Sequence, residues 1–215
     1  MNQTTDNFGE GVVADWNSDS FEDLYASVGG DLDQVPWARL GPHPMLVEWL
    51  DRRTIAPGSR ALVVACGLGD DAEELSGRGC EVTAFDLSET AIGWCRRRFP
   101  ASSVHYQVAD LLELPEEWAH RYDIVVEINT IQSISPDLRD RTVRAIADTV
   151  APGGALFVRC LGRADDESVA SRPWPVSRKD LAVFEQEGLR EAEFAEDFPE
   201  PGRHRWFRLA YERIF

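Results

Sequence analysis

A glycine-rich turn is the first feature of the chain whose residue types and spacing could do chemistry. In the stretch ALVVACGLGDDAEEL, residues 61–75, Gly67 and Gly69 separate an apolar segment from the start of a helix. Glycine lets the backbone turn tightly and lets a ligand approach it closely. Asp86 ends the next apolar segment about 20 residues later, where a carboxylate can accept hydrogen bonds from both hydroxyls of a ribose. The relaxed GxGxxA spacing therefore predicts an adenosine-binding turn.

Four acids follow the glycines at the start of the predicted helix: Asp70, Asp71, Glu73 and Glu74. They would repel the phosphates that NAD or ATP brings to a helix N-terminus. A ligand without phosphate and with net positive charge would not be repelled. S-adenosylmethionine is such a ligand, because it combines adenosine with an ammonium, a carboxylate and a sulfonium. The acids also complement the helix dipole, and this structural explanation stays open beside the first.

Two later strand ends add polar groups to the same predicted site. Asp110 follows the segment VHYQVA and can accept a hydrogen bond from an adenine amino group, while Leu111 can pack on the ring. Glu127, Asn129 and Thr130 lie at the end of YDIVVEINT. We expect this strand end to face the methyl group and its acceptor, with Glu127 serving the cofactor or an acceptor amine.

Two groups of residues are candidates for handling the acceptor. His43, which lies between two prolines, and Asn129 are the candidate catalytic residues, and a base is needed only if the acceptor must lose a proton. An exposed or helix-capping histidine is the alternative interpretation of His43. Trp37 and Trp174 are candidate walls of the acceptor site, although packing is the commoner role of tryptophan.

Hydrophobic patterning indicates the elements that position these residues. From residue 60 onward, short apolar segments alternate with amphipathic ones. We expect strands at 61–66, 81–88, 104–112, 122–130, 154–162, 189–198 and 204–215, and helices at 20–28, 71–79, 88–100, 136–150 and 176–189, with APGG as a turn. This alternation implies a mostly parallel sheet covered on both faces, with ligands bound beyond the carboxyl ends of its strands.

Length and charge exclude several classes of partner. The chain has 215 residues and a net charge of −16, so we expect one well-buried core and no binding to DNA, RNA or acidic membrane surfaces. No apolar run approaches the roughly 18 residues of a membrane span, and the N-terminus does not resemble a signal peptide. The four cysteines are scattered, which favours neither a metal site nor disulfides and indicates a reducing cytoplasm. A monomer and a homodimer are both open.

The motifs VVACGLGDDA, VTAFDLSETAI, VADLLEL, YDIVVEINT and APGGALFVR, taken in order, resemble the class I S-adenosylmethionine-dependent methyltransferases over residues 60–215. The resemblance implies a Rossmann-like α/β fold, a three-layer sandwich with a mostly parallel seven-stranded sheet whose last strand, HRWFRLAYERIF, is antiparallel. Within this class the chain is most similar to the thiopurine methyltransferase-like and tellurite-resistance-like small-molecule branch. We expect one domain overall, with residues 1–59 as a flexible segment and helical lid and residues 60–215 as the core.

The resemblance also implies the cofactor and the residues that bind it. The cofactor is S-adenosylmethionine and the product S-adenosylhomocysteine; the glycines line the methionine end, Asp86 the ribose and Asp110 the adenine. The expected cofactor-binding residues are Trp37, Cys66, Gly67, Gly69, Asp86, Leu87, Asp110, Leu111 and Glu127, and the expected acceptor-binding residues are Trp37, Thr130 and Trp174. Ala65 stands where many members carry an acid, so backbone carbonyls or an acid elsewhere must bind the methionine ammonium.

The predicted activity is methyl transfer to a sulfur, oxygen or nitrogen nucleophile of a small molecule by in-line displacement. Two alternatives remain open. An NAD(P)-dependent oxidoreductase can use a similar sheet with a similar glycine turn. A protein that binds S-adenosylmethionine without catalysis would also fit the cofactor residues, and the missing acid at Ala65 leaves this possibility open.

Overall fold

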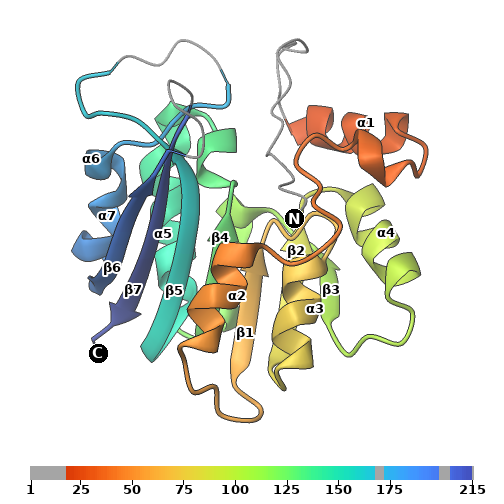
Figure 1. The fold of residues 1–215 in the computed structure, drawn as a ribbon, viewed down its shortest axis with the longest axis horizontal. Helices are drawn as coiled ribbons and strands as arrows, with labels where there is room; N and C mark the ends of the chain where they lie inside the picture. The colour runs from red at the N-terminus through yellow and green to blue at the C-terminus, as the bar shows by residue number, and fades with distance from the viewer. Residues whose placement is uncertain (1–17, 168–171, 199–203, 215) are drawn as a thin grey trace. The chain divides into compact units, whose positions relative to one another are not determined.

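A computed structural model of the chain describes residues 18–167, 172–198 and 204–214 (Figure 1). The expected flexible segment at the N-terminus therefore falls almost wholly outside the described residues. The helices are α1 Ser18–Ser27, α2 Pro44–Asp51, α3 Asp70–Gly77, α4 Glu89–Arg98, α5 Arg139–Thr149, α6 Arg178–Leu181 and α7 Val183–Gln186. The strands are β1 Arg60–Val64, β2 Glu81–Asp86, β3 His105–Val108, β4 Tyr122–Ile128, β5 Val150–Gly162, β6 Leu189–Asp197 and β7 Arg205–Arg213.

The strands form a seven-stranded sheet in the order β3-β2-β1-β4-β5-β7-β6. The pairs β2–β3, β1–β4 and β4–β5 are parallel, whereas β7 runs antiparallel to both β5 and β6. The α/β fold with a mostly parallel sheet and an antiparallel last strand, which the motifs implied, is therefore confirmed.

The chain forms two compact units. One contains residues 1–58 and 66–109, and the other contains residues 59–65 and 110–215. These units differ from the predicted division into a lid at 1–59 and a core at 60–215, which stays a prediction. Within the described residues, no helix combines the length and the apolar character that crossing a membrane requires.

In the first unit, helices α3 and α4 pack on β2, α4 also packs on β3, and α1 lies beside α4 (Figure 1). Helix α4 begins after Ser88, whose side chain accepts a hydrogen bond from the backbone N–H of Ala91 at 3.0 Å. This N-cap ends the preceding strand at Asp86, two residues earlier than predicted. Three arginines in the last turn of α4 complement the negative end of its dipole.

An apolar cluster joins the N-terminal part of this unit to α4 and the glycine turn. Its buried members are Tyr25, Val35, Leu68, Ala91 and Trp94. Partly buried side chains from residues 24–38 pack around them. Burial of this apolar surface holds the segment that follows α1 against α4 and the turn.

In the second unit, α5 packs on β4 and β5, and α7 packs on β6 and α5. The APGG turn predicted before β5 lies within that strand, because the pairing passes from Tyr122 with Val150 to Ile124 with Ala155. The four intervening residues form an irregularity in the ladder rather than a separate turn. The single helix predicted at 176–189 is two short helices, α6 and α7.

Candidate active site

The turn between β1 and α3 depends on two glycines in left-handed conformations. Gly67 has φ 52° and Gly69 has φ 88°. A Cβ on Gly69 would lie 2.6 Å from the hydroxyl of Tyr106 and 3.0 Å from the sulfur of Cys95. Packing against β3 and α4 therefore requires glycine at position 69. The Cys95 thiol also donates to the carbonyl of Gly67 at 3.1 Å, which fixes the turn on α4.

Asp86 binds this turn directly from the end of β2. Its Oδ2 accepts from the backbone N–H of Gly67 at 2.9 Å, and its Oδ1 accepts from that of Ser88 at 3.0 Å. The side chain is buried, and burial raises the pKa of Asp86 while these backbone hydrogen bonds oppose the rise. Each carboxylate oxygen can accept further hydrogen bonds. Ser88 caps α4, and Leu87, between Asp86 and Ser88, is 41% exposed.

The acids at the start of α3 bind neighbouring elements of the protein. Asp70 accepts two hydrogen bonds of 2.8 Å from the guanidinium of Arg98, which also donates to the carbonyl of Leu68. Asp71 accepts from the backbone N–H of His43 at 2.7 Å, and burial raises its pKa to about 6. These contacts favour the structural explanation of the acids, since the charge of Asp70 is balanced within the protein.

His43 is buried at the N-terminus of α2. Its Nδ1 accepts a hydrogen bond of 3.2 Å from the backbone N–H of Met45, so the ring caps the helix. This is the alternative that the sequence left open for His43, and its catalytic role stays a prediction. Trp37 lies beside the glycine turn, because a Cβ on Gly67 would lie 3.9 Å from its indole nitrogen. Its indole N–H donates to the hydroxyl of Tyr25 at 2.9 Å.

Sequence reasoning missed two residues of α1: Tyr25, which lies against the glycine turn, and Glu22, which binds the start of α4. A Cβ on Gly67 would lie 3.2 Å from the hydroxyl of Tyr25. The carboxylate of Glu22 accepts from the hydroxyls of Ser88, at 2.5 Å, and Thr90. The spacing of apolar residues in SFEDLY indicates a helix, but it carries no signal for partners more than 60 residues away in the chain.

In the second unit, Glu127 organises the loop after β4. Its Oε1 accepts from the backbone N–H groups of Thr130, at 2.6 Å, and Ile131, at 3.1 Å. The side chain is fully buried, and within the described part of the chain its Oε2 has no hydrogen-bond partner. Burial raises the pKa of Glu127 to about 7, although its backbone hydrogen bonds and the charge of Arg159 oppose the rise.

Asn129 lies in this loop with φ 68°. Its Oδ1 accepts from Arg159 at 3.1 Å and from Gln132 at 3.3 Å, and its backbone N–H donates to the carbonyl of Arg159 at 2.9 Å. Because a guanidinium is only a donor, the bond to Arg159 identifies the amide oxygen. The Nδ2 group of Asn129 therefore points away from these two donors.

The loop that carries Trp174 is attached to the same region. The backbone N–H of Trp174 donates to the carbonyl of Gln132 at 2.8 Å, and its carbonyl accepts from Arg139 at 3.1 Å. The guanidinium of Arg172 lies 4.6 Å from the centroid of the Trp174 ring. The second unit thus brings three predicted acceptor-site residues, Asn129, Thr130 and Trp174, into neighbouring loops.

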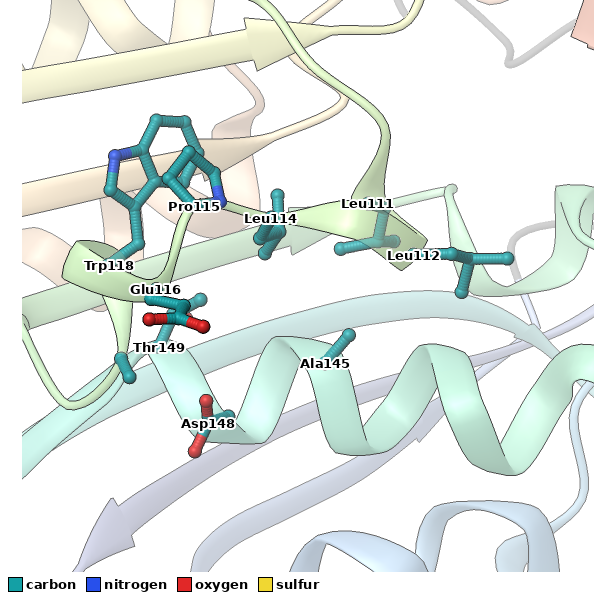
Figure 2. Close-up of a pocket in the computed structure, with 10 residues that line it drawn as sticks. Leu111, Leu112, Leu114, Pro115, Glu116, Trp118, Ala145, Asp148 and Thr149 are labelled. Carbon is teal, nitrogen blue, oxygen red and sulfur yellow. The ribbon is translucent and has the colours of Figure 1, made fainter.

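The two residues predicted for the adenine occupy the loop after β3. Asp110 is exposed, and its carboxylate caps a short 3-10 helix by accepting from the backbone N–H of Leu112 at 2.8 Å. Leu111 is buried and lines a cavity of about 290 Å³ between residues 111–119 and α5 (Figure 2). Leucines and Trp118 line this cavity, and Leu111 is its single member among the predicted site residues.

Residues 61–154 match a family model described as "Methyltransferase domain". A ubiquinone biosynthesis O-methyltransferase from Aromatoleum aromaticum is 34% identical over 123 residues, which are 56% of this chain and 52% of the relative. The chain spans about half the length of the curated relatives it matches.

Two solved structures extend the comparison to the fold. A geranyl diphosphate methyltransferase in complex with SAM has a TM-score of 0.67 at 14% identity, covering 79% of this chain and 84% of that one. TehB from Haemophilus influenzae has a TM-score of 0.66 at 16% identity, covering 80% of this chain and 62% of that one. Likenesses at these identities show the fold.

The chain thus has the fold of the class I S-adenosylmethionine-dependent methyltransferases, and its residues 61–154 match the model of a methyltransferase domain. The resemblance found in the motifs is confirmed to that extent. The narrower similarity to the thiopurine methyltransferase-like and tellurite-resistance-like branch stays a prediction.

Proposed function

We propose that the protein binds S-adenosylmethionine and transfers its methyl group to a small-molecule nucleophile. The observation that carries this proposal is the joining of the glycine turn to Asp86 by a 2.9 Å hydrogen bond. This bond holds a carboxylate able to accept ribose hydroxyls beside a turn that lacks side chains at two positions. The match of residues 61–154 to a methyltransferase domain and the O-methyltransferase activity of the relatives support the same conclusion.

The first unit carries most of the residues proposed to bind the cofactor. Gly67 and Cys66 would hold the methionine end, Asp86 and Leu87 the ribose, and Trp37 would cover them. In the second unit, Asp110, Leu111 and Glu127 are the proposed adenine and methyl-side residues. When bound, S-adenosylmethionine supplies a methyl group on a sulfonium, a leaving group that needs no metal or covalent intermediate. The chain's own contribution is then positioning and exclusion of water.

The acceptor side of the proposal is built on the loops after β4 and β5. Thr130 and Trp174 are proposed to line the acceptor. Asn129 is proposed to donate from Nδ2 to the acceptor atom, because its Oδ1 already accepts from Arg159 and Gln132. His43 stays a proposed base for acceptors that must lose a proton, although its Nδ1 is used in capping α2. The acceptor atom can be sulfur, oxygen or nitrogen.

Calorimetry with three ligands tests the proposal against its two rivals. Wild-type protein is titrated with S-adenosylmethionine, S-adenosylhomocysteine and NADH. Binding of the first two and not of NADH supports the proposal, and binding of NADH alone supports an oxidoreductase. Methyl-group transfer from radiolabelled S-adenosylmethionine to a panel of thiols, phenols and amines then distinguishes an enzyme from a protein that only binds the cofactor.

We also propose that the protein acts in the cytoplasm on small molecules and does not bind nucleic acid. The four free cysteines and the net charge of −16 support this setting. Size-exclusion chromatography with light scattering will distinguish a monomer from a homodimer.

A further inference from the structure

The hydroxyl of Tyr25 is buried against the turn proposed to bind the cofactor. Tyr25 lies on α1 and is 2% exposed. Its oxygen would lie 3.2 Å from a Cβ placed on Gly67, so it lies against the face of that glycine that carries no side chain. No motif in the sequence pairs these two residues.

The partner of Tyr25 determines what its hydroxyl can do. The indole N–H of Trp37 lies 2.9 Å from the hydroxyl oxygen, and an indole N–H is only a donor. Tyr25 must accept this hydrogen bond, which leaves its own proton to donate. Among the residues that the structure describes, none accepts that proton. A buried donor without an acceptor destabilises the protein, and a ligand that accepts from it would remove that cost.

The hydroxyl is held in place before any ligand binds. Tyr25 makes edge contacts with Trp37 and Trp94, each with ring centroids 5.7 Å apart. Glu22, one helical turn earlier, binds Ser88 and Thr90 at the start of α4. A donor fixed in this way pays little entropy when a ligand binds.

We propose that Tyr25 is a cofactor-binding residue whose hydroxyl donates to the amino-acid carboxylate of bound S-adenosylmethionine. This inference rests on the proposed function and deepens it. A neutral donor matches the one anionic group of that ligand, whereas the ribose hydroxyls suit the acceptor Asp86. Burial raises the pKa of Tyr25 well above its ordinary value, so the hydroxyl keeps its proton at neutral pH.

A pair of ligands that differ in the carboxylate tests this assignment. S-adenosylhomocysteine carries the amino-acid group, and 5′-methylthioadenosine lacks it. Calorimetry measures both dissociation constants for the wild type, for Tyr25→Phe and for the control Tyr211→Phe, which removes a buried hydroxyl from β7. We expect Tyr25→Phe to weaken S-adenosylhomocysteine about tenfold and to leave methylthioadenosine within about twofold, and the control to change neither.

Other outcomes overturn the assignment. Equal weakening of both ligands would mean that Tyr25 supports the turn without contacting the carboxylate, and unchanged affinities would remove it from the site. A wild type that binds neither ligand would refute the proposed function itself, which separates the two failures. If Tyr25→Phe does not fold by circular dichroism, Trp37→Phe, which releases the Tyr25 hydroxyl from its partner, must show the same selective loss in weaker form.

Discussion

Gly67 and Asp86 are joined by a hydrogen bond of 2.9 Å from the backbone N–H of the glycine to Oδ2 of the aspartate. The bond links the turn after β1 to the end of β2 and aligns the two features that the sequence predicted to bind adenosine. The other oxygen of Asp86 accepts from Ser88 at the start of α4. One carboxylate therefore sets the shape of the turn and offers further acceptor capacity to a ligand.

Replacing Asp86 should weaken cofactor binding. We expect Asp86→Ala to weaken the binding free energy of S-adenosylhomocysteine by roughly 1–3 kcal/mol, which is the range for losing a charged hydrogen-bond acceptor. Calorimetry measures the change, and Asp137→Ala, which removes an exposed acid, is the control. An unchanged affinity in a folded Asp86→Ala variant would remove Asp86 from the site.

Gly69 should not tolerate a side chain. A Cβ there would meet the Tyr106 hydroxyl at 2.6 Å, and φ is 88°. We expect Gly69→Ala to lower the free energy of unfolding by about 2–4 kcal/mol, from left-handed strain together with overpacking. Chemical denaturation measures the loss. Gly77→Ala, with nothing within 4 Å of its Cβ, should be neutral or slightly stabilising, and equal losses in both variants would contradict the explanation.

Glu22 should hold α1 on α4. Its carboxylate accepts from the hydroxyls of Ser88 and Thr90 near the positive end of the α4 dipole. We expect Glu22→Ala to speed amide hydrogen exchange in α1 about tenfold, while global stability falls by about 1 kcal/mol. The neighbouring exposed acid provides the control Asp23→Ala, which should exchange like the wild type. Unaltered exchange in Glu22→Ala would show that the apolar cluster alone holds the helix.

The buried carboxyl of Glu127 should make stability depend on pH. Its pKa is about 7 in the folded protein against an ordinary value of 4.5, so the folded state keeps a proton that the unfolded chain has lost. The free energy of unfolding should therefore fall as pH rises from about 4.5 to 7, by at most about 3 kcal/mol from this group. The charge of Arg159 opposes the rise in the pKa of Glu127. The charge of Glu127 in turn contributes to raising the pKa of the buried Cys160 thiol.

Glu127→Gln tests this pH dependence because it keeps an oxygen for the amides of Thr130 and Ile131 and does not titrate. Urea denaturation at several pH values should show a smaller fall for Glu127→Gln than for the wild type. Glu113→Gln, at an exposed position, should follow the wild type. A wild-type curve that parallels that of Glu127→Gln would mean that Glu127 is ionised throughout this range.

Much of the fold could be predicted because its signals are local. Alternation of apolar segments indicated the strands, and the glycines at 67 and 69 marked the turn before α3. Errors arose where two local signals competed. APGG has the composition of a turn, but pairing with β4 absorbs it into β5 as an irregularity. The strand predicted at 81–88 ends at Asp86, because Ser88 accepts the hydrogen bond from the third residue of α4.

The sequence by itself determined the order of strands and helices, the glycine turn and an acid at the end of β2, because periodicity and turn chemistry act over a few residues. Only the tertiary structure decided that Tyr25 borders Gly67, that Glu22 binds Ser88 across 66 residues of chain, and that Arg98 pairs with Asp70 across 28. Such pairs form when packing brings distant elements together, and no local pattern encodes which donor meets which acceptor.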